Sequence, residues 1–224
     1  ASRQNTVYKR INLMADIAII DYGMGNVHSV YKAFNKVINK DSEIKITRSL
    51  DDLLDCSHIV FPGQGAASEC MRNINKNLDI VEFKKIISQK PFLGICMGLQ
   101  VLMTHSDENK GSNCLGVLDG EVHSLKSKIN TGLKVPHMGW NKIKQAKDHP
   151  LWKNIPDESF FYFVHSYYVS PSNKSNILAT TTYDLDFVSA LYKDNIAAVQ
   201  FHPEKSSNMG LQLLENFINW NGET

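Results

Sequence analysis

Short apolar segments alternate with stretches of helical periodicity through the first half of the chain. Residues 16–22 form an apolar segment that ends at Gly23, and apolar side chains then recur at helical spacing from Val27 to Ile38, behind Asn26 as a capping residue. The same reading predicts strands over 43–48, 58–61 and 91–95, and a helix over 80–87. This alternation favours a mostly parallel sheet with helices on both faces.

The second half of the chain has a different pattern, rich in β-branched and aromatic residues. Strands are predicted over 135–143, 160–169, 177–183, 187–192 and 196–201, and a final helix carries Leu211, Leu214, Phe217 and Ile218 on one stripe. Some of these strands should pair antiparallel. The predicted fold is therefore α/β, with a doubly wound, mostly parallel central sheet and antiparallel β additions in the second half.

The length of 224 residues fits a single domain, which we predict over residues 15–224. Residues 1–14 are polar and basic without clear periodicity, and we interpret them as an appended N-terminal arm. The 24 basic and 23 acidic residues nearly balance, which argues against a nucleic-acid or membrane-surface partner. No apolar run approaches the roughly 20 residues of a membrane span, and no signal peptide is apparent.

The four cysteines, at positions 56, 70, 96 and 114, follow no CxxC spacing. Neither a disulfide framework nor a metal site is predicted, and no cofactor is expected. Reduced thiols of this kind are typical of a cytoplasmic protein.

The segment 92–100, with sequence FLGICMGLQ, places Cys96 between two glycines where an apolar run gives way to a helical pattern. A strand that turns sharply into a helix strains the turn residue and needs small neighbours, so we expect a nucleophile elbow with an exposed cysteine. The helix start would favour the thiolate. The alternative is a small, inert core cysteine.

A cysteine nucleophile needs a base, and the base needs a carboxylate to orient it. The predicted strand 196–201 should stop before Pro203, which leaves His202 at its end. Glu204, two residues on, would return to the same side and fix the tautomer of the imidazole. The alternative is an ordinary loop.

The segment 62–65, with sequence PGQG, follows a strand that should run beside the elbow strand. Glycines let backbone N–H groups approach a reacting centre, as an oxyanion hole requires, and a second donor would be the N–H of Met97. The alternative is a simple turn.

The order PGQG, GICMGLQ and FHPEKS resembles the class I glutamine amidotransferases, which have a flavodoxin-like fold and hydrolyse glutamine with a Cys-His-Glu triad. Three further segments, IIDYGMGN at 19–26, VPHMGWN at 135–141 and FYFVHSYY at 161–168, are similar to the glutaminase subunits of imidazole glycerol phosphate synthases.

The resemblance implies a role for each matching position. Cys96, His202 and Glu204 would be catalytic, and Gln64, Gly65 and Met97 would form the oxyanion hole. L-Glutamine would be bound by Gly63, Gln100, Glu108, Ser166 and Tyr167. For Gln100 and Glu108 the alternatives are a polar helix position and a solvated loop.

The family couples this subunit to a separate (β/α)8-barrel cyclase, which uses the ammonia to make imidazole glycerol phosphate and an aminoimidazole carboxamide ribonucleotide in histidine biosynthesis. The implied interface consists of Asn26, His137, Met138, Trp140, Tyr162 and Lys205, some of which could be ordinary packed aromatics. Three other functions stay open: ammonia supply to a sugar-amidating enzyme, a cysteine hydrolase on the same scaffold, and a non-catalytic binding module.

Overall fold

Five parallel strands form the centre of the protein. The computed structural model describes residues 16–129 and 132–223, so the arm predicted at 1–14 lies outside the described residues. The parallel strands lie in the order β2 (Ile44–Thr47), β1 (Ile17–Ile20), β3 (His58–Gly63), β4 (Phe92–Cys96) and β14 (Ile196–Val199). This order is that of flavodoxin-like folds, in which ligands bind beyond the carboxyl ends of the strands.

Antiparallel strands extend this sheet, as predicted. β13 (Leu185–Lys193) pairs with β14, followed by β11 (Tyr167–Pro171) and β7 (Gly120–Ser124). The short strands β5 (His105–Ser106) and β6 (Ser112–Asn113) complete this edge, while β12 (Ile177–Tyr183) pairs with β13 and β9 (Lys144–Gln145).

A second, two-stranded sheet is formed by β8 (His137–Lys142) and β10 (Phe160–His165). The single strand predicted over 160–169 is therefore wrong. The chain leaves one sheet at Ser166 and enters the other as β11, because the aromatic run is long enough to serve two strands.

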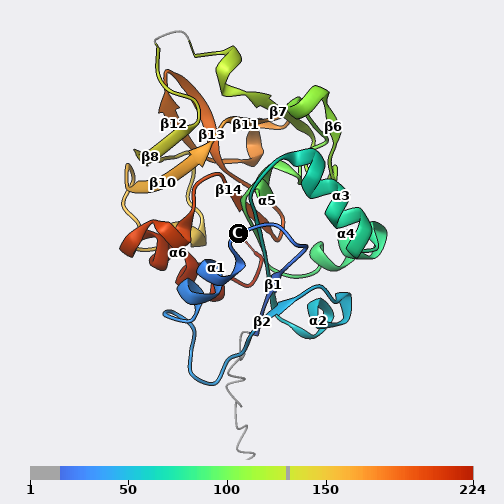
Figure 1. Cartoon of the computed structure of the whole chain (residues 1–224). Helices are drawn as coiled ribbons and strands as arrows, with labels where there is room; N and C mark the ends of the chain where they lie inside the picture. Colours follow the sequence, from blue (N-terminus) through green and yellow to red (C-terminus); the bar gives the residue numbers. More distant parts are fainter. Residues whose placement is uncertain (1–15, 130–131, 224) are drawn as a thin grey trace, which may run out of the picture.

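Helices cover both faces of the central sheet, because alternate residues of each strand point to opposite sides. In β1, Ile17 and Ile19 belong to one core cluster and Ala18 and Ile20 to the other. The first face is covered by α1 (Val27–Phe34) and α6 (Ser207–Ile218) (Figure 1). The second is covered by α2 (Leu50–Asp55), α3 (Ala67–Asn77), α4 (Ile80–Ile87) and the short α5 (Met97–Gln100).

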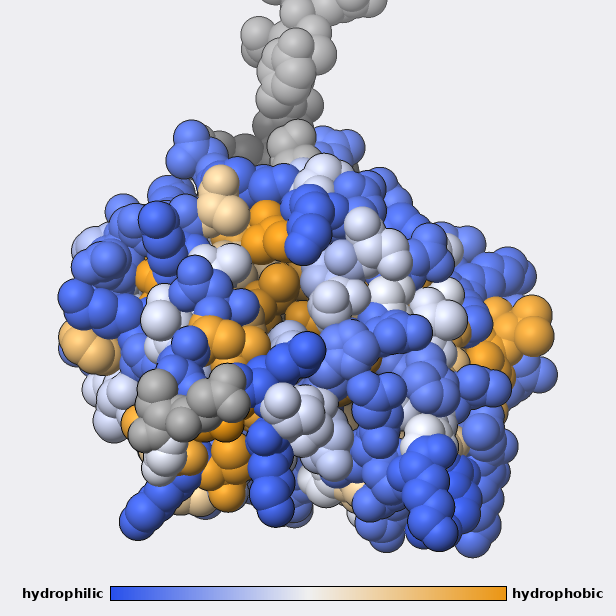
Figure 2. Space-filling view, turned by 90° about the horizontal axis from the view of Figure 1, so that it is seen from above, coloured by the Kyte–Doolittle hydropathy of each residue, from blue (hydrophilic) through white to orange (hydrophobic). Residues whose placement is uncertain are grey.

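In the described part of the chain, five short 3-10 helices connect these elements: η1 (Glu108–Lys110), η2 (Leu125–Ser127), η3 (Pro150–Trp152), η4 (Lys174–Asn176) and η5 (Pro203–Lys205). The face of the molecule seen in Figure 2 is mostly hydrophilic, with smaller hydrophobic patches between the polar side chains. Among the described helices, none combines the length and apolar character that crossing a bilayer requires.

Candidate active site

Cys96 occupies a strained turn between β4 and α5, as the sequence predicts. Its φ of 55° and ψ of −107° lie where side chains other than glycine are rarely found. The flanking glycines make the turn possible: a Cβ on Gly98 would lie 1.9 Å from the carbonyl oxygen of Phe61, and one on Gly94 would lie 2.9 Å from the carbonyl oxygen of Gly98. Small residues at both positions let α5 pack directly on β3 and β4.

Cys96 is nevertheless buried, and the expectation that it stands exposed is wrong. Only 7% of the residue is accessible, because its sulfur lies under neighbouring strands. The sulfur is 4.0 Å from the carbonyl oxygen of Val164 in β10 and 3.7 Å from Nε2 of Gln200. It is reached through a pocket that Cys96 helps to line.

His202 and Glu204 form a buried pair just beyond β14. Nδ1 of His202 donates to Oε1 of Glu204 at 2.8 Å, and the Glu204 side chain is 2% exposed. β14 ends at Val199, two residues earlier than predicted, and Glu204 reaches the ring through the turn of η5 rather than along an extended strand. With Nδ1 held as a donor, Nε2 is the ring atom left for proton transfer.

The charge state of His202 is set by its neighbours. Burial lowers the pKa of the imidazole, but the Cys96 thiolate and the Glu204 carboxylate outweigh burial and raise this pKa to about 10. His202 is therefore an imidazolium at neutral pH. A positive ring between a thiolate and a carboxylate is poised to donate a proton.

A pocket of about 400 Å³ opens beside Cys96 and His202, at the carboxyl ends of the parallel strands. Its size suits a small molecule such as an amino acid. The site residues predicted from the sequence that line it are Cys96, His202, Gln64, Gly65, Met97, Gln100, Glu108, Ser166, Tyr167 and Lys205.

Gly63 does not line this pocket, so the structure gives no support for its predicted role in binding glutamine. It pairs with Cys96 at the ends of β3 and β4. A Cβ there would lie 2.4 Å from the hydroxyl of Tyr22 and 2.8 Å from Cβ of Met97. Gly63 is needed for close packing under the elbow.

Gln100 and Glu108 lie at the pocket but are already engaged within the protein. Nε2 of Gln100 donates to the carbonyl oxygen of Tyr167 at 3.2 Å and to Oε1 of Gln200 at 3.0 Å. Its own Oε1 is buried and has no partner in the part of the chain that the structure describes. Oε2 of Glu108 accepts from the backbone N–H of Ala67, the first residue of α3, at 2.6 Å.

Two histidines connect β8 to the pocket wall. His165 lines the pocket, and its Nδ1 donates to the carbonyl oxygen of Tyr167 at 2.9 Å, which leaves Nε2 to accept from Nδ1 of His137 at 3.0 Å. Burial lowers the pKa of His137 to about 4 and that of His165 to about 3, so both rings are neutral. The pair supports the loop at Ser166 and Tyr167.

His137 is misplaced in the predicted interface, because it is 3% exposed and stacks on Phe163 and Tyr183. Alternation along β8 turns it inward and turns Met138 and Trp140 outward. Asn26, also predicted there, uses its side chain to cap α1 by accepting from the N–H of Ser29.

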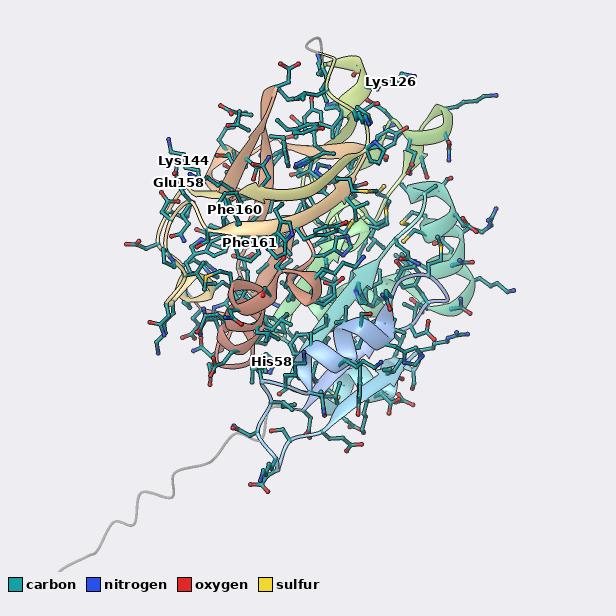
Figure 3. All side chains as sticks on the ribbon, turned by 60° about the vertical axis from the view of Figure 1, so that its left-hand side comes forward. His58, Lys126, Lys144, Glu158, Phe160 and Phe161 are labelled. Carbon is teal, nitrogen blue, oxygen red and sulfur yellow. The ribbon has the colours of Figure 1, made fainter. Side chains whose placement is uncertain are left out.

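An apolar surface, the β8–β10 face, covers the outer side of the two-stranded sheet. Trp140 lies opposite Tyr162 with ring centroids 6.1 Å apart, and the ammonium group of Lys205 lies over the Tyr162 ring. Neighbouring residues of β10 point to opposite sides, so Phe160 is 51% exposed and Phe161 is buried (Figure 3). The residues of the β8–β10 face are Met138, Trp140, Phe160, Tyr162, Val164 and Lys205.

The sequence interpretation missed two of the residues described above. Gln200 touches the sulfur, and its signal was a polar side chain inside an otherwise apolar strand. Phe160 extends the β8–β10 face, and its signal was the alternation of large residues at 160, 162 and 164. Within residues 16–129 and 132–223, no three His, Cys, Asp or Glu side chains are grouped to hold a metal ion.

Comparisons with known proteins show which family the chain is similar to. Two proteins named imidazole glycerol phosphate synthase subunit HisH are each 50% identical to this chain: that of Hydrogenovibrio crunogenus, aligned over 92% of the chain and 97% of the relative, and that of Nitrosococcus oceani, over 93% and 99%.

Solved structures show the same fold at low identity. A chain described as part of a putative GMP synthase from Thermoplasma acidophilum matches with a TM-score of 0.66 at 19% identity, covering 92% of this chain and 93% of that one. A glutamine amidotransferase from Thermotoga maritima matches with a TM-score of 0.57 at 17% identity, covering 88% and 79%. The model of the family Glutamine amidotransferase class-I matches residues 18–220. The chain therefore belongs to the class I glutamine amidotransferases.

Proposed function

We propose that this protein is the glutaminase subunit of an imidazole glycerol phosphate synthase. It hydrolyses L-glutamine and passes the ammonia to a separate (β/α)8-barrel cyclase in histidine biosynthesis. The observation that carries the proposal is the juxtaposition, at one pocket, of Cys96 in its strained turn with the His202–Glu204 pair. The name of the relatives at 50% identity supports this choice of pathway.

In the first half of the reaction, the Cys96 thiolate adds to the side-chain amide carbon of glutamine. The imidazolium of His202 gives its proton to the departing nitrogen, so ammonia leaves and a γ-glutamyl thioester remains. In the second half, neutral His202 takes a proton from water as the oxygen adds to the thioester carbon. The thiolate then leaves, and glutamate is released.

The oxyanion that forms in both halves needs donors at the pocket wall. Met97 begins α5, so its backbone N–H has no acceptor within the helix. Gln64 and Gly65 line the pocket from the loop after β3 and could supply a second backbone N–H. The polar side chains of the pocket fit an amino acid: the carboxylate of Glu108 suits the α-ammonium group of glutamine, and the backbone of Ser166 and Tyr167 suits its α-carboxylate.

The β8–β10 face is the proposed docking surface for the cyclase. Three of its apolar residues, Met138, Trp140 and Phe160, are more than half exposed. Val164 and Lys205 lie both on this face and on the pocket wall, so a partner seated there would border the site where ammonia forms. Sheltered transfer matters because ammonia released into neutral water becomes ammonium, which is no nucleophile. The proposal includes a cytoplasmic location, which is supported by the four free thiols, since cysteines stay reduced in the cytoplasm.

The test is reconstitution with the cyclase, using Cys96→Ala. We expect the variant complex to lose synthesis of imidazole glycerol phosphate from glutamine and to keep synthesis from added ammonium salts. Loss of both activities would contradict a role of Cys96 confined to ammonia release. Glutamine hydrolysis that supports a sugar-amidating enzyme, but not the cyclase, would reassign the partner, and cleavage of small peptides in place of glutamine would reassign the reaction.

A further inference from the structure

Gln200 lies behind the sulfur of Cys96, on the short segment between β14 and His202. Its side chain is fully buried, and its Nε2 is 3.7 Å from Cys96 Sγ, within hydrogen-bonding reach of sulfur. Gln200 is not one of the described residues that line the pocket. Its side chain therefore contacts the sulfur from the side away from the pocket. It thus contacts the nucleophile and not the pocket in which glutamine would bind.

A backbone carbonyl dictates which end of the Gln200 amide faces the sulfur. The carbonyl oxygen of Tyr167 can only accept, so the Gln100 atom beside it must be the donor Nε2. The same Nε2 points at Gln200, whose facing atom must therefore be the acceptor Oε1. This leaves the Nε2 donor of Gln200 for Cys96. The sulfur thus faces an N–H group of Gln200. Rotating the amide of either Gln100 or Gln200 by half a turn would break two of these three contacts.

A fixed N–H donor treats the two forms of the sulfur differently. The thiol finds only a weak backbone acceptor among the described residues, the carbonyl oxygen of Val164 at 4.0 Å, and transfer of its proton to His202 turns the sulfur into a pure acceptor. The thiolate accepts from Gln200, and hydrogen bonds to a charged acceptor are about twice as strong as neutral ones.

We propose that Gln200 is a further catalytic residue. Its side-chain N–H donates a hydrogen bond to the Cys96 thiolate from the side opposite the substrate, which stabilises the thiolate and fixes its position. The inference rests on the proposed glutaminase function. In that reaction the donor acts twice, before the thiolate forms its bond to carbon and again when the carbon–sulfur bond breaks and the electron pair returns to sulfur. Gln200 itself exchanges no proton.

Two variants separate hydrogen bonding from packing. Gln200→Met keeps the length of the side chain and removes the donor. Gln200→Glu keeps the shape and places an acceptor beside the sulfur. The matched control is Ser189→Ala on the adjacent β13, where a fully buried hydroxyl has no hydrogen-bond partner in the described structure.

The first measurement is the rate of alkylation of Cys96 by iodoacetamide against pH, in the full-length chain, read at this residue by peptide mass spectrometry because three other cysteines are present. All variants keep the ionisable groups that face the site, namely Tyr22, Glu108, His202, Glu204 and Lys205. A shift between the Gln200→Met protein and the parent therefore reports the lost donor, while Gln200→Glu adds the effect of a new carboxyl group.

We expect the pH of half-maximal alkylation to rise by about one to two units in both Gln200 variants, which corresponds to roughly 10- to 100-fold slower alkylation at pH values below the midpoint of the parent protein. In the complex with the cyclase, kcat/KM for glutamine should fall in the same pH range and recover at higher pH. Ser189→Ala should match the parent protein in both assays.

Unchanged alkylation profiles in a folded Gln200→Met protein would overturn the inference, as would a Gln200→Glu protein as reactive as the parent. If Gln200→Met does not fold, Gln200→Leu, which also removes the donor and adds no charge, decides in its place. Failure of the proposed function has a different signature, since the parent complex would then lack glutaminase activity whatever the alkylation profiles show.

Discussion

The pair formed by Cys96 and His202 depends on a third residue that touches neither the sulfur nor the substrate pocket. Glu204 accepts the Nδ1 proton of His202 and, by its charge, helps to raise the pKa of the ring. Because both side chains are nearly inaccessible, this interaction is weakly screened by solvent. The carboxylate therefore influences both the direction in which the ring points and the pH at which it loses its proton.

Glu204→Gln should lower kcat/KM for glutamine by roughly 10²- to 10⁴-fold in the complex, because the amide lacks the negative charge that stabilises the imidazolium and fixes its tautomer. It should also move the alkaline limb of the pH profile downward. That limb follows loss of the proton of His202, whose pKa is about 10 in the parent protein, and removing a carboxylate that raises this pKa can only lower it.

The measurement is kcat/KM against pH for both proteins. Titration of the glutamine α-ammonium group is common to the two profiles and cancels in their difference. An alkaline limb at the same pH in both would contradict the role assigned to the carboxylate.

At the scale of elements, the nucleophile depends on how closely α5 approaches β3. Gly98 faces the carbonyl oxygen of Phe61 so tightly that no side chain fits between them. Gly210 in α6 faces the carbonyl oxygen of Pro203 in the same way, which seats α6 against the turn that holds Glu204. Glycines thus position the helices on which both halves of the site depend.

Gly98→Ala should destabilise the fold by about 1–3 kcal/mol or more, because the added methyl group would lie 1.9 Å from a backbone oxygen and must push α5 away. Denaturant unfolding measures the change. Asn75→Ala on the exposed side of α3 is the control and should change stability by at most about 0.5 kcal/mol. Equal stabilities for the two variants would refute the packing argument.

Much of the central sheet could be predicted because its strands are short apolar runs that end at Gly or Pro, as 58–61 does before PGQG. α3 was missed, although Ala67, Cys70, Met71 and Ile74 are buried at helical spacing. Its polar composition and the loop before it concealed the pattern. The division of 160–169 could not be predicted, because periodicity within a strand carries no information on which sheet it joins.

The site was predictable where spacing along the chain determines contact, as for His202 and Glu204. Prediction failed for two particular contacts that cross between strands. The burial of His137 follows from its pairing with His165 across β8 and β10, and the contact of Gln200 with Cys96 follows from the pairing of β14 with β4. Neither pairing can be read from local sequence.

At the scale of the whole molecule, the β8–β10 face and the pocket form one continuous feature. Outward residues of both strands form the face, while Val164 and Lys205 continue into the pocket. His137 and His165 link the same two strands to Tyr167 at the pocket wall. A partner bound to the face would therefore touch the elements that shape the substrate site.

Trp140→Ala should weaken binding of the cyclase by about 2 kcal/mol or more, which is roughly a 30-fold rise in Kd, because exposed aromatic residues dominate protein interfaces. Titration calorimetry measures Kd. The control is Val81→Ala on α4, where an 80% exposed apolar residue lies on an element outside the proposed interface. Equal losses for both variants would argue against the β8–β10 face as the docking surface.

The isolated protein should hydrolyse glutamine roughly 10²- to 10³-fold more slowly than the complex, if the backbone of the Gln64 loop presents an oxyanion donor only when the partner is bound. Glutaminase assays with and without the cyclase measure the ratio. Full turnover by the isolated chain would mean that the donor is already in place.

The adjacent strands β4 and β14 lead to the two residues of the catalytic pair, since β4 ends at Cys96 and His202 follows β14. The ribosome nevertheless makes β4 well before β14. While the polypeptide is still emerging from the ribosome, there is a stage at which Cys96 has been made and His202, the acid that protonates the leaving ammonia, has not. Chains that end before His202 consequently lack the acid and cannot hydrolyse the cell's glutamine, and the site is completed only after β14 has joined the sheet.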